Sequence, residues 1–96
     1  MSDTFEAVLG KAVLRAAAAL DISEGELTRI VVDESAKRLF VKLYISLVAL
    51  TGDDNSARSW MISENFVLAG RPFDLIGQPD GLEKVSHYLV SSQEWR

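Results

Sequence analysis

The sequence predicts an all-α fold, a compact bundle of about six helices in a single domain of residues 1–96. Apolar residues recur at spacings of three and four along most of the chain, which is the spacing of one face of a helix. Residues that cap helix N-termini, mainly Ser and Asp, precede several of these segments. The 96 residues, 48% of them hydrophobic and none of them Cys, suffice for one modest core without a disulfide or a thiolate metal site.

The first predicted helix covers residues Thr4 to Leu20. Asp3 or Thr4 can cap its start, and Asp21-Ile22 ends it. The apolar residues of this segment follow the helical spacing closely, and we expect them to face the core: Phe5, Val8, Leu9, Ala12, Val13, Ala16, Ala17 and Leu20.

A short second helix is predicted to begin at Ser23. Ser23 and Glu26 have the spacing of a capping box, in which each side chain accepts a hydrogen bond from the other residue's backbone N–H. A strand over residues 29–32 is the local alternative, although no partner strand is evident. The helix is expected to bury Leu27, Ile30 and Val31.

The third predicted helix is the central helix of the core. It can start at Asp33-Glu34-Ser35, and it runs to about Leu50 with Gly52 just past its end. Residues 40–48 are also rich in β-formers, but the length of the segment and its caps favour a helix. The side chains expected to face inward are Leu39, Phe40, Leu43, Tyr44, Leu47 and Leu50.

A fourth helix is predicted to run from the cluster of capping residues at 53–56 to about Ile62. Its spacing places Ala57, Trp60 and Met61 against the core.

Both prolines indicate helix starts in the last third of the chain. Pro72 and Pro79 each fit the first position of a helix, where the fixed φ is favourable and no N–H is needed. We expect Gly70 to form a tight turn and Gly77 to end the first of these helices in a left-handed conformation. The last helix is predicted from near Pro79 to about Gln93. Its apolar face holds Leu82, Val85 and Leu89.

The order of these residues resembles the toxin-binding domain of Xre/MbcA/ParS-type antitoxins. The resemblance rests on the stretch Leu68-Ala-Gly-Arg-Pro-Phe-Asp-Leu-Ile and on Asp80-Gly-Leu. Its signature residues are Trp60, Asn65, Gly70, Pro72, Gly81 and Leu89. It implies that residues 53–96 form an antitoxin-like toxin-binding region. Residues 1–52 more weakly resemble the helices around the family's helix-turn-helix, here present only as a remnant.

The resemblance also implies a function. Members of this family neutralise a RES-type toxin, an NAD-degrading enzyme, and the C-terminal end of the antitoxin lies near the toxin's active site. By position, this implies toxin-binding roles for Trp95 and Arg96, and Arg71 matches a position of the family's motif. A tail folded back onto the bundle is the alternative role of Trp95. The implied partner is a protein toxin, and a homodimer is compatible with it.

DNA binding is not expected. Only Val31 to Arg38 separates the second helix from the long third helix, which leaves no room for a turn and a separate recognition helix. The net charge of −4 also argues against binding a polyanion. A small dimeric DNA-binding regulator and an orphan protein-interaction module are the alternatives to an antitoxin.

The sequence does not indicate an enzyme or a cofactor. His87 is the only histidine, so one chain cannot form a multi-histidine metal site, and its neighbours Ser86 and Tyr88 do not make a catalytic triad. The longest apolar runs fall short of the ~20 residues of a membrane span, and the N-terminal residues lack the basic start of a secretion signal. A cytoplasmic location is therefore expected.

Overall fold

Six helices make up the part of the chain that the computed structural model describes, residues 2–94, with side chains described for residues 7–92. They are α1 (Ser2–Ala19), α2 (Glu24–Ile30), α3 (Glu34–Thr51), α4 (Asp54–Ile62), α5 (Pro72–Leu75) and α6 (Gly81–Glu94). Within these residues the one extended pairing is an isolated bridge between Asn65 and Gly70. The predicted all-α class is confirmed, and the strand alternative at 29–32 is wrong. None of the described helices has the length and apolar character needed to cross a membrane.

Side-chain caps set the starts of α2, α3 and α4, as the sequence predicts. Ser23 and Glu26 form the complete capping box, with the Ser23 Oγ accepting from the Glu26 N–H at 3.3 Å and the Glu26 carboxylate accepting from the Ser23 N–H at 3.1 Å. The carboxylates of Asp33 and Asp53 each accept a hydrogen bond from the N–H three residues further on. These bonds satisfy amides that a helix leaves unpaired at its first turn.

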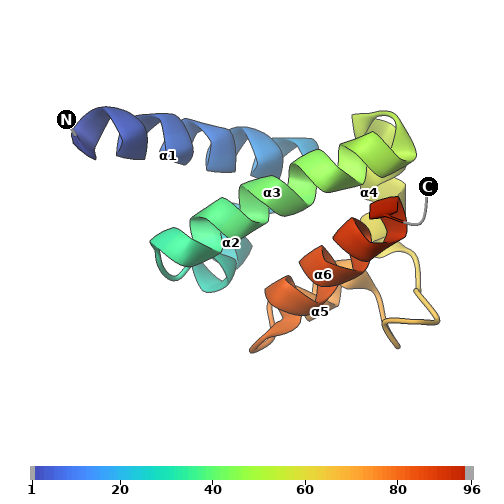
Figure 1. Ribbon diagram of the computed structural model, residues 1–96. Helices are drawn as coiled ribbons and strands as arrows, with labels where there is room; N and C mark the ends of the chain where they lie inside the picture. The colour runs from blue at the N-terminus through green and yellow to red at the C-terminus, as the bar shows by residue number, and fades with distance from the viewer. Residues whose placement is uncertain (1, 95–96) are drawn as a thin grey trace.

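Helix α3 lies at the centre of the fold. It packs most extensively against α6 and also contacts α1 and α4 (Figure 1). Phe40, Leu43 and Leu47 on α3 are completely buried, as are Val85 and Leu89 on α6. The predicted inward face of the third helix is thus confirmed. Each such side chain contributes ~1.5–3 kcal/mol through its removal from water.

Helix α1 packs through its second half. Val13, Ala16, Ala17 and Leu20 are buried, whereas Val8 is 62% exposed. The prediction that Val8 faces the core is therefore wrong, and Figure 1 shows the reason, since α1 and α3 diverge toward the N-terminus. The side chain of Phe5 lies outside the described residues.

Trp60 lies at the edge of the core rather than inside it. Its ring is partly buried and stacks on Tyr88 of α6, with ring centroids 6.3 Å apart and an interplanar angle of 22°. The interior position on this face of α4 belongs to Met61, which is completely buried together with Ala57. Trp60 therefore connects α4 to α6 through an aromatic pair.

The chain enters α6 through a turn rather than through a proline at the first helical position. Pro72 is the first residue of α5, as predicted, but Pro79 precedes α6 by two residues and lies in a turn. The turn is closed by the Gly81 N–H, which donates to the Gln78 carbonyl oxygen at 2.9 Å. Asp80, with φ of 63°, takes the left-handed position of this turn.

Gly81 occupies a position where no larger residue fits. A Cβ atom on it would lie 1.6 Å from the carbonyl oxygen of Leu75, so α6 can start against the end of α5 only if this residue is glycine. Gly77, in contrast, does not have a positive φ, and Ile76 ends α5 in a right-handed conformation. The prediction of a left-handed cap at Gly77 is wrong.

Candidate functional site

The segment 63–71, which we call the 63–71 loop, is fixed by its own backbone between α4 and α5. The Asn65 N–H donates to the Gly70 carbonyl oxygen at 2.9 Å, and the Gly70 N–H donates to the Asn65 carbonyl oxygen at 3.2 Å. The Asn65 side chain accepts a further bond from the Leu68 N–H, three residues on, at 3.0 Å inside the loop. Three hydrogen bonds thus close a hairpin-like turn of four residues, 66–69.

Gly70 is part of a tight turn, as predicted, but it does not supply the left-handed conformation. That conformation belongs to Ala69, whose φ is 60°. A Cβ on Gly70 would make only ordinary contact with the Leu75 side chain, at 3.7 Å. The residue with the unfavourable left-handed backbone is therefore Ala69, one position before Gly70.

The loop inserts one apolar side chain into the core and presents two to solvent. Leu68 is 5% exposed and anchors the loop, while Phe66 is 99% exposed and Val67 is 71% exposed. Figure 1 shows the loop between α4 and α5, extending beyond the helices at the right of the view. Phe66 and Val67 are not among the site residues that the sequence predicts. The signal was two adjacent large apolar residues between the turn-forming Asn65 and Gly70.

Arg71 is the last residue of the 63–71 loop and has an anionic partner, Asp74. Its Nε lies 2.9 Å and its Nη2 lies 3.2 Å from the two carboxylate oxygens of Asp74, one turn further along. Both side chains are about half exposed. This bidentate pair orients the guanidinium at the start of α5. An anionic group on a partner would have to share it with Asp74 or displace Asp74.

The remaining candidate residues lie apart from the loop or serve the fold. Trp95 and Arg96 lie outside the described residues. Pro72 is buried as the first residue of α5, Gly81 forms the close contact with α5, and Leu89 belongs to the core. The structure therefore brings Asn65, Gly70 and Arg71 together in one exposed segment.

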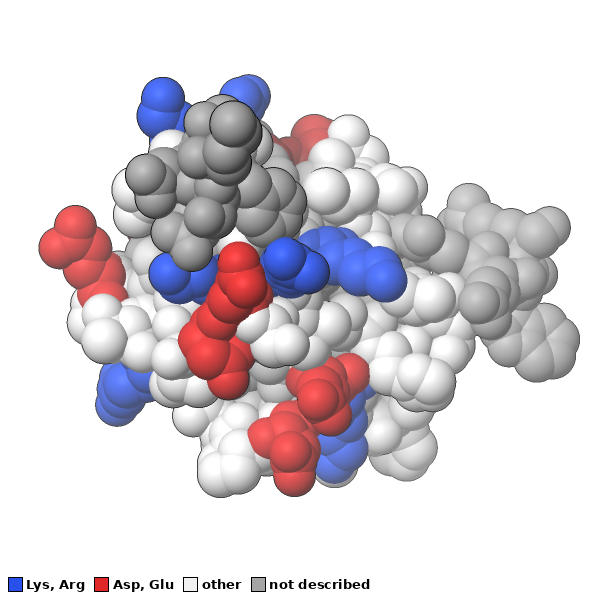
Figure 2. Space-filling view, turned by 60° about the vertical axis from the view of Figure 1, so that its left-hand side comes forward, with Lys and Arg blue, Asp and Glu red and all other residues white. Residues whose placement is uncertain are grey.

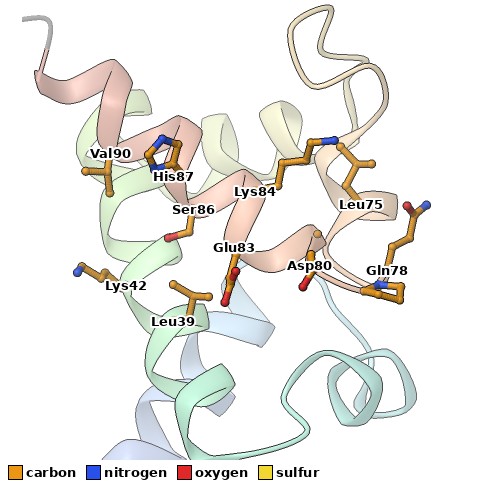
Figure 3. A pocket seen from close by; sticks show the side chains of 12 residues that line it. Leu39, Lys42, Leu75, Gln78, Asp80, Glu83, Lys84, Ser86, His87 and Val90 are labelled. Carbon is orange, nitrogen blue, oxygen red and sulfur yellow. The ribbon is translucent and has the colours of Figure 1, made fainter.

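An open groove of about 750 Å³ runs between α3 and α6 (Figure 3). Leu39 and Lys42 line it from α3, while Glu83, Lys84 and His87 line it from α6. Ser86 is 3% exposed, whereas the adjacent His87 is exposed. Neighbouring residues of a helix do not face each other, so these two side chains do not make a nucleophile–base pair.

Charged side chains of both signs lie next to one another on the face that Figure 2 shows. Within the described helices, Arg38 and Glu34 on α3 form one such pair, 3.7 Å apart. The described residues also hold no group of three or more His, Asp or Glu side chains placed to bind a metal ion. Phe66, at the tip of the 63–71 loop, is the most exposed of the large apolar side chains in the described part of the chain, at 99%.

These features define a small helical protein with a preformed, exposed loop next to its last two helices. Residues 46–93 match the family model of the antitoxin Xre/MbcA/ParS C-terminal toxin-binding domain. The match covers half of the chain, and the protein therefore belongs to this antitoxin family, as its sequence predicts. No curated protein matches the chain significantly. The matched segment begins inside α3 and includes α4, the 63–71 loop, α5 and nearly all of α6.

Proposed function

We propose that the protein is a non-catalytic antitoxin that binds a RES-type, NAD-degrading toxin and neutralises it by occluding its active site, without binding operator DNA itself. The observation that carries this proposal is the match of residues 46–93 to a toxin-binding domain. The half of the molecule that matches is also the half that contains the preformed loop and its exposed arginine.

Arg71, Trp95 and Arg96 are the residues proposed to contact the toxin. Arg71 is 47% exposed, and guanidinium groups suit carboxylate and phosphate partners such as those of an NAD site. Trp95 and Arg96 follow α6 in the sequence and combine a large apolar ring with a fixed positive charge. Such pairs are frequent among the residues that dominate protein interfaces.

The proposed absence of DNA binding is supported by the way α2 connects to α3. Only Val31, Val32 and Asp33 lie between the two helices, so no separate recognition helix is present there. The middle of α3 is buried, with Phe40 and Leu43 at 0% exposure, and a recognition helix must instead present side chains to the major groove.

The proposal is tested with a purified RES-domain enzyme. The purified enzyme consumes NAD, and the unaltered protein should suppress this activity when the two are near equimolar. A folded preparation, checked by its helical circular dichroism, that leaves NAD consumption unchanged at a tenfold excess would contradict the proposed function.

A further inference from the structure

We propose that Phe66 and Val67 anchor toxin binding, with the apolar tip of the 63–71 loop inserting into an apolar pocket on the protein toxin. This inference rests on the proposed function and deepens it, because it places the main contact on the loop rather than on the charged residues alone.

The distribution of exposed apolar side chains points to this loop. Within the described residues, the large hydrophobic side chains that stay exposed in the matched segment are Ile62, Phe66 and Val67. All three fall in the short stretch 62–67. Phe66 is 99% exposed, so its ring contributes almost no burial to the folded state of the free protein. An aromatic ring left in water at this position gains contact only when a partner covers it.

The conformation of the loop makes it suitable as an anchor. The paired backbone bonds of Asn65 and Gly70, the hydrogen bond from the Leu68 N–H to the Asn65 side chain and the buried Leu68 side chain hold residues 66 and 67 in one arrangement before any partner arrives. Binding by a preformed loop loses little conformational entropy, which favours affinity. Aromatic side chains that enter a pocket are among the common hot spots of protein interfaces.

Charged groups at the base of the loop complete an interface pattern. Glu64 is exposed before the hairpin-like turn, and the Arg71–Asp74 pair is half exposed after it. A polar rim around an apolar centre is the usual arrangement of a protein–protein interface, because the rim shields the centre from water. Phe66 and Val67 would form the centre, with these charged groups at the rim.

The toxin is the favoured occupant over a second copy of this chain. A projecting tip needs a concave acceptor, and the groove between α3 and α6 is the candidate acceptor on a second copy. Most of the residues that line that groove lie within the matched segment, whereas Leu39 and Lys42 of α3 precede it. The loop itself lies wholly within the toxin-binding match. Its position therefore favours a contact with the toxin.

The test measures the affinity of Phe66→Ala and Val67→Ala for a purified RES-domain enzyme that the unaltered protein inhibits. Val32→Ala is the matched control, because Val32 is 74% exposed but lies outside the matched segment. We expect Phe66→Ala to raise the Kd by at least ~30-fold, which corresponds to ~2 kcal/mol. Val67→Ala should have a smaller effect, and Val32→Ala should stay within ~2-fold of the unaltered protein. Thermal melting should confirm that all variants are folded.

The outcomes separate the two proposals. Binding of Phe66→Ala within ~3-fold of the unaltered protein would overturn the anchor and leave the antitoxin function standing. If the unaltered protein self-associates and Phe66→Ala loses that self-association while its toxin binding is unchanged, the proposed anchor is also overturned. The loop tip would then bind a second copy of this chain. Failure of the unaltered protein to bind would instead refute the proposed function, and the anchor with it.

Discussion

Single residues in the last third of the chain differ sharply in what they tolerate. Gly70 and Gly81 both lie in the matched segment, but only Gly81 is in contact with a backbone carbonyl that excludes a Cβ. Ala69 keeps a left-handed φ of 60° next to a glycine that does not need one. The requirement for glycine at Gly81 depends on how α6 packs against the end of α5, which the spacing of residues in the sequence does not reveal.

The first prediction compares two glycine substitutions. Gly81→Ala should destabilise the protein by at least ~2 kcal/mol, because its Cβ would collide with the Leu75 carbonyl and force α5 and α6 apart. Gly70→Ala, whose Cβ finds ordinary contact distances, should change the free energy of unfolding by less than ~1 kcal/mol. Urea unfolding of both variants measures the difference. Equal stabilities would mean that the close approach of α6 to Leu75 is absent in solution.

At the scale of the helices, the first residues of α2, α3 and α4 are determined by local capping interactions, which the sequence predicts. The capping box at Ser23, the caps at Asp33 and Asp53 and the glycine after α3 lie where they were predicted. Each depends on residues within three or four positions. The first residue of α6 could not be predicted in this way, because proline is equally suited to a turn and to the first position of a helix.

The burial of a helix face was predicted correctly only where a neighbouring helix packs along that face. The face of α3 was predicted because α3 is covered along its length, whereas Val8 follows the same spacing but extends past its partner. The candidate site shows the same limit. The sequence predicted the turn at Gly70, and Asn65 and Gly70 were recognised by their resemblance to the antitoxin family. The exposure of Phe66 could not be predicted in the same way, because apolar residues are generally expected inside a protein.

The second prediction concerns the cap of α4 and acid. The Asp53 carboxylate accepts a hydrogen bond from the Ser56 backbone N–H at 2.7 Å, and this bond lowers the pKa of Asp53 below its ordinary value of 3.8. A carboxyl group whose pKa is lowered by folding stabilises the fold above its unfolded pKa, and this contribution is lost as the pH falls through the folded value. The stabilisation should therefore be complete above about pH 5 and decline below about pH 4.

Melting temperatures measured from pH 7 to pH 3 test this cap. The difference between the unaltered protein and Asp53→Ala should shrink on acidification, because the alanine variant lacks the acceptor at every pH. Asp53→Asn keeps a neutral acceptor oxygen, so its stability should fall less with acid than that of the unaltered protein. A difference that stays constant down to pH 3 would show that the Asp53 charge does not contribute.

At the scale of the whole molecule, the third prediction concerns the end of the chain. Deleting residues 94–96 should leave the helical signal and the melting temperature nearly unchanged, because terminal residues are usually the least coupled to a core. If Trp95 and Arg96 reach the toxin's active site, the same deletion should raise the antitoxin concentration needed to suppress NAD loss by at least ~10-fold, or ~1.4 kcal/mol. Equal inhibition by both forms would leave the 63–71 loop as the binding surface.

The fourth prediction concerns nucleic acid. With a net charge of −4 and a three-residue connection between α2 and α3, the isolated protein should not recognise its own promoter at physiological salt. Fluorescence anisotropy should give no sequence-specific Kd tighter than ~10⁻⁷ M. A tighter value that survives competition by unrelated DNA would instead support a DNA-binding regulator.

The extensive packing of α3 against α6 has a consequence for the order of folding. These two helices are separated along the chain by α4, the 63–71 loop and α5, so their encounter closes a long segment, whereas α3 meets α4 after a short turn. Longer closures lose more chain entropy and tend to occur later in folding. We therefore expect α6 to dock last. The hydrogen bonds that close the 63–71 loop join residues 65–70 alone, so a newly made chain can gain most of its helices and this loop before α3 and α6 complete the core.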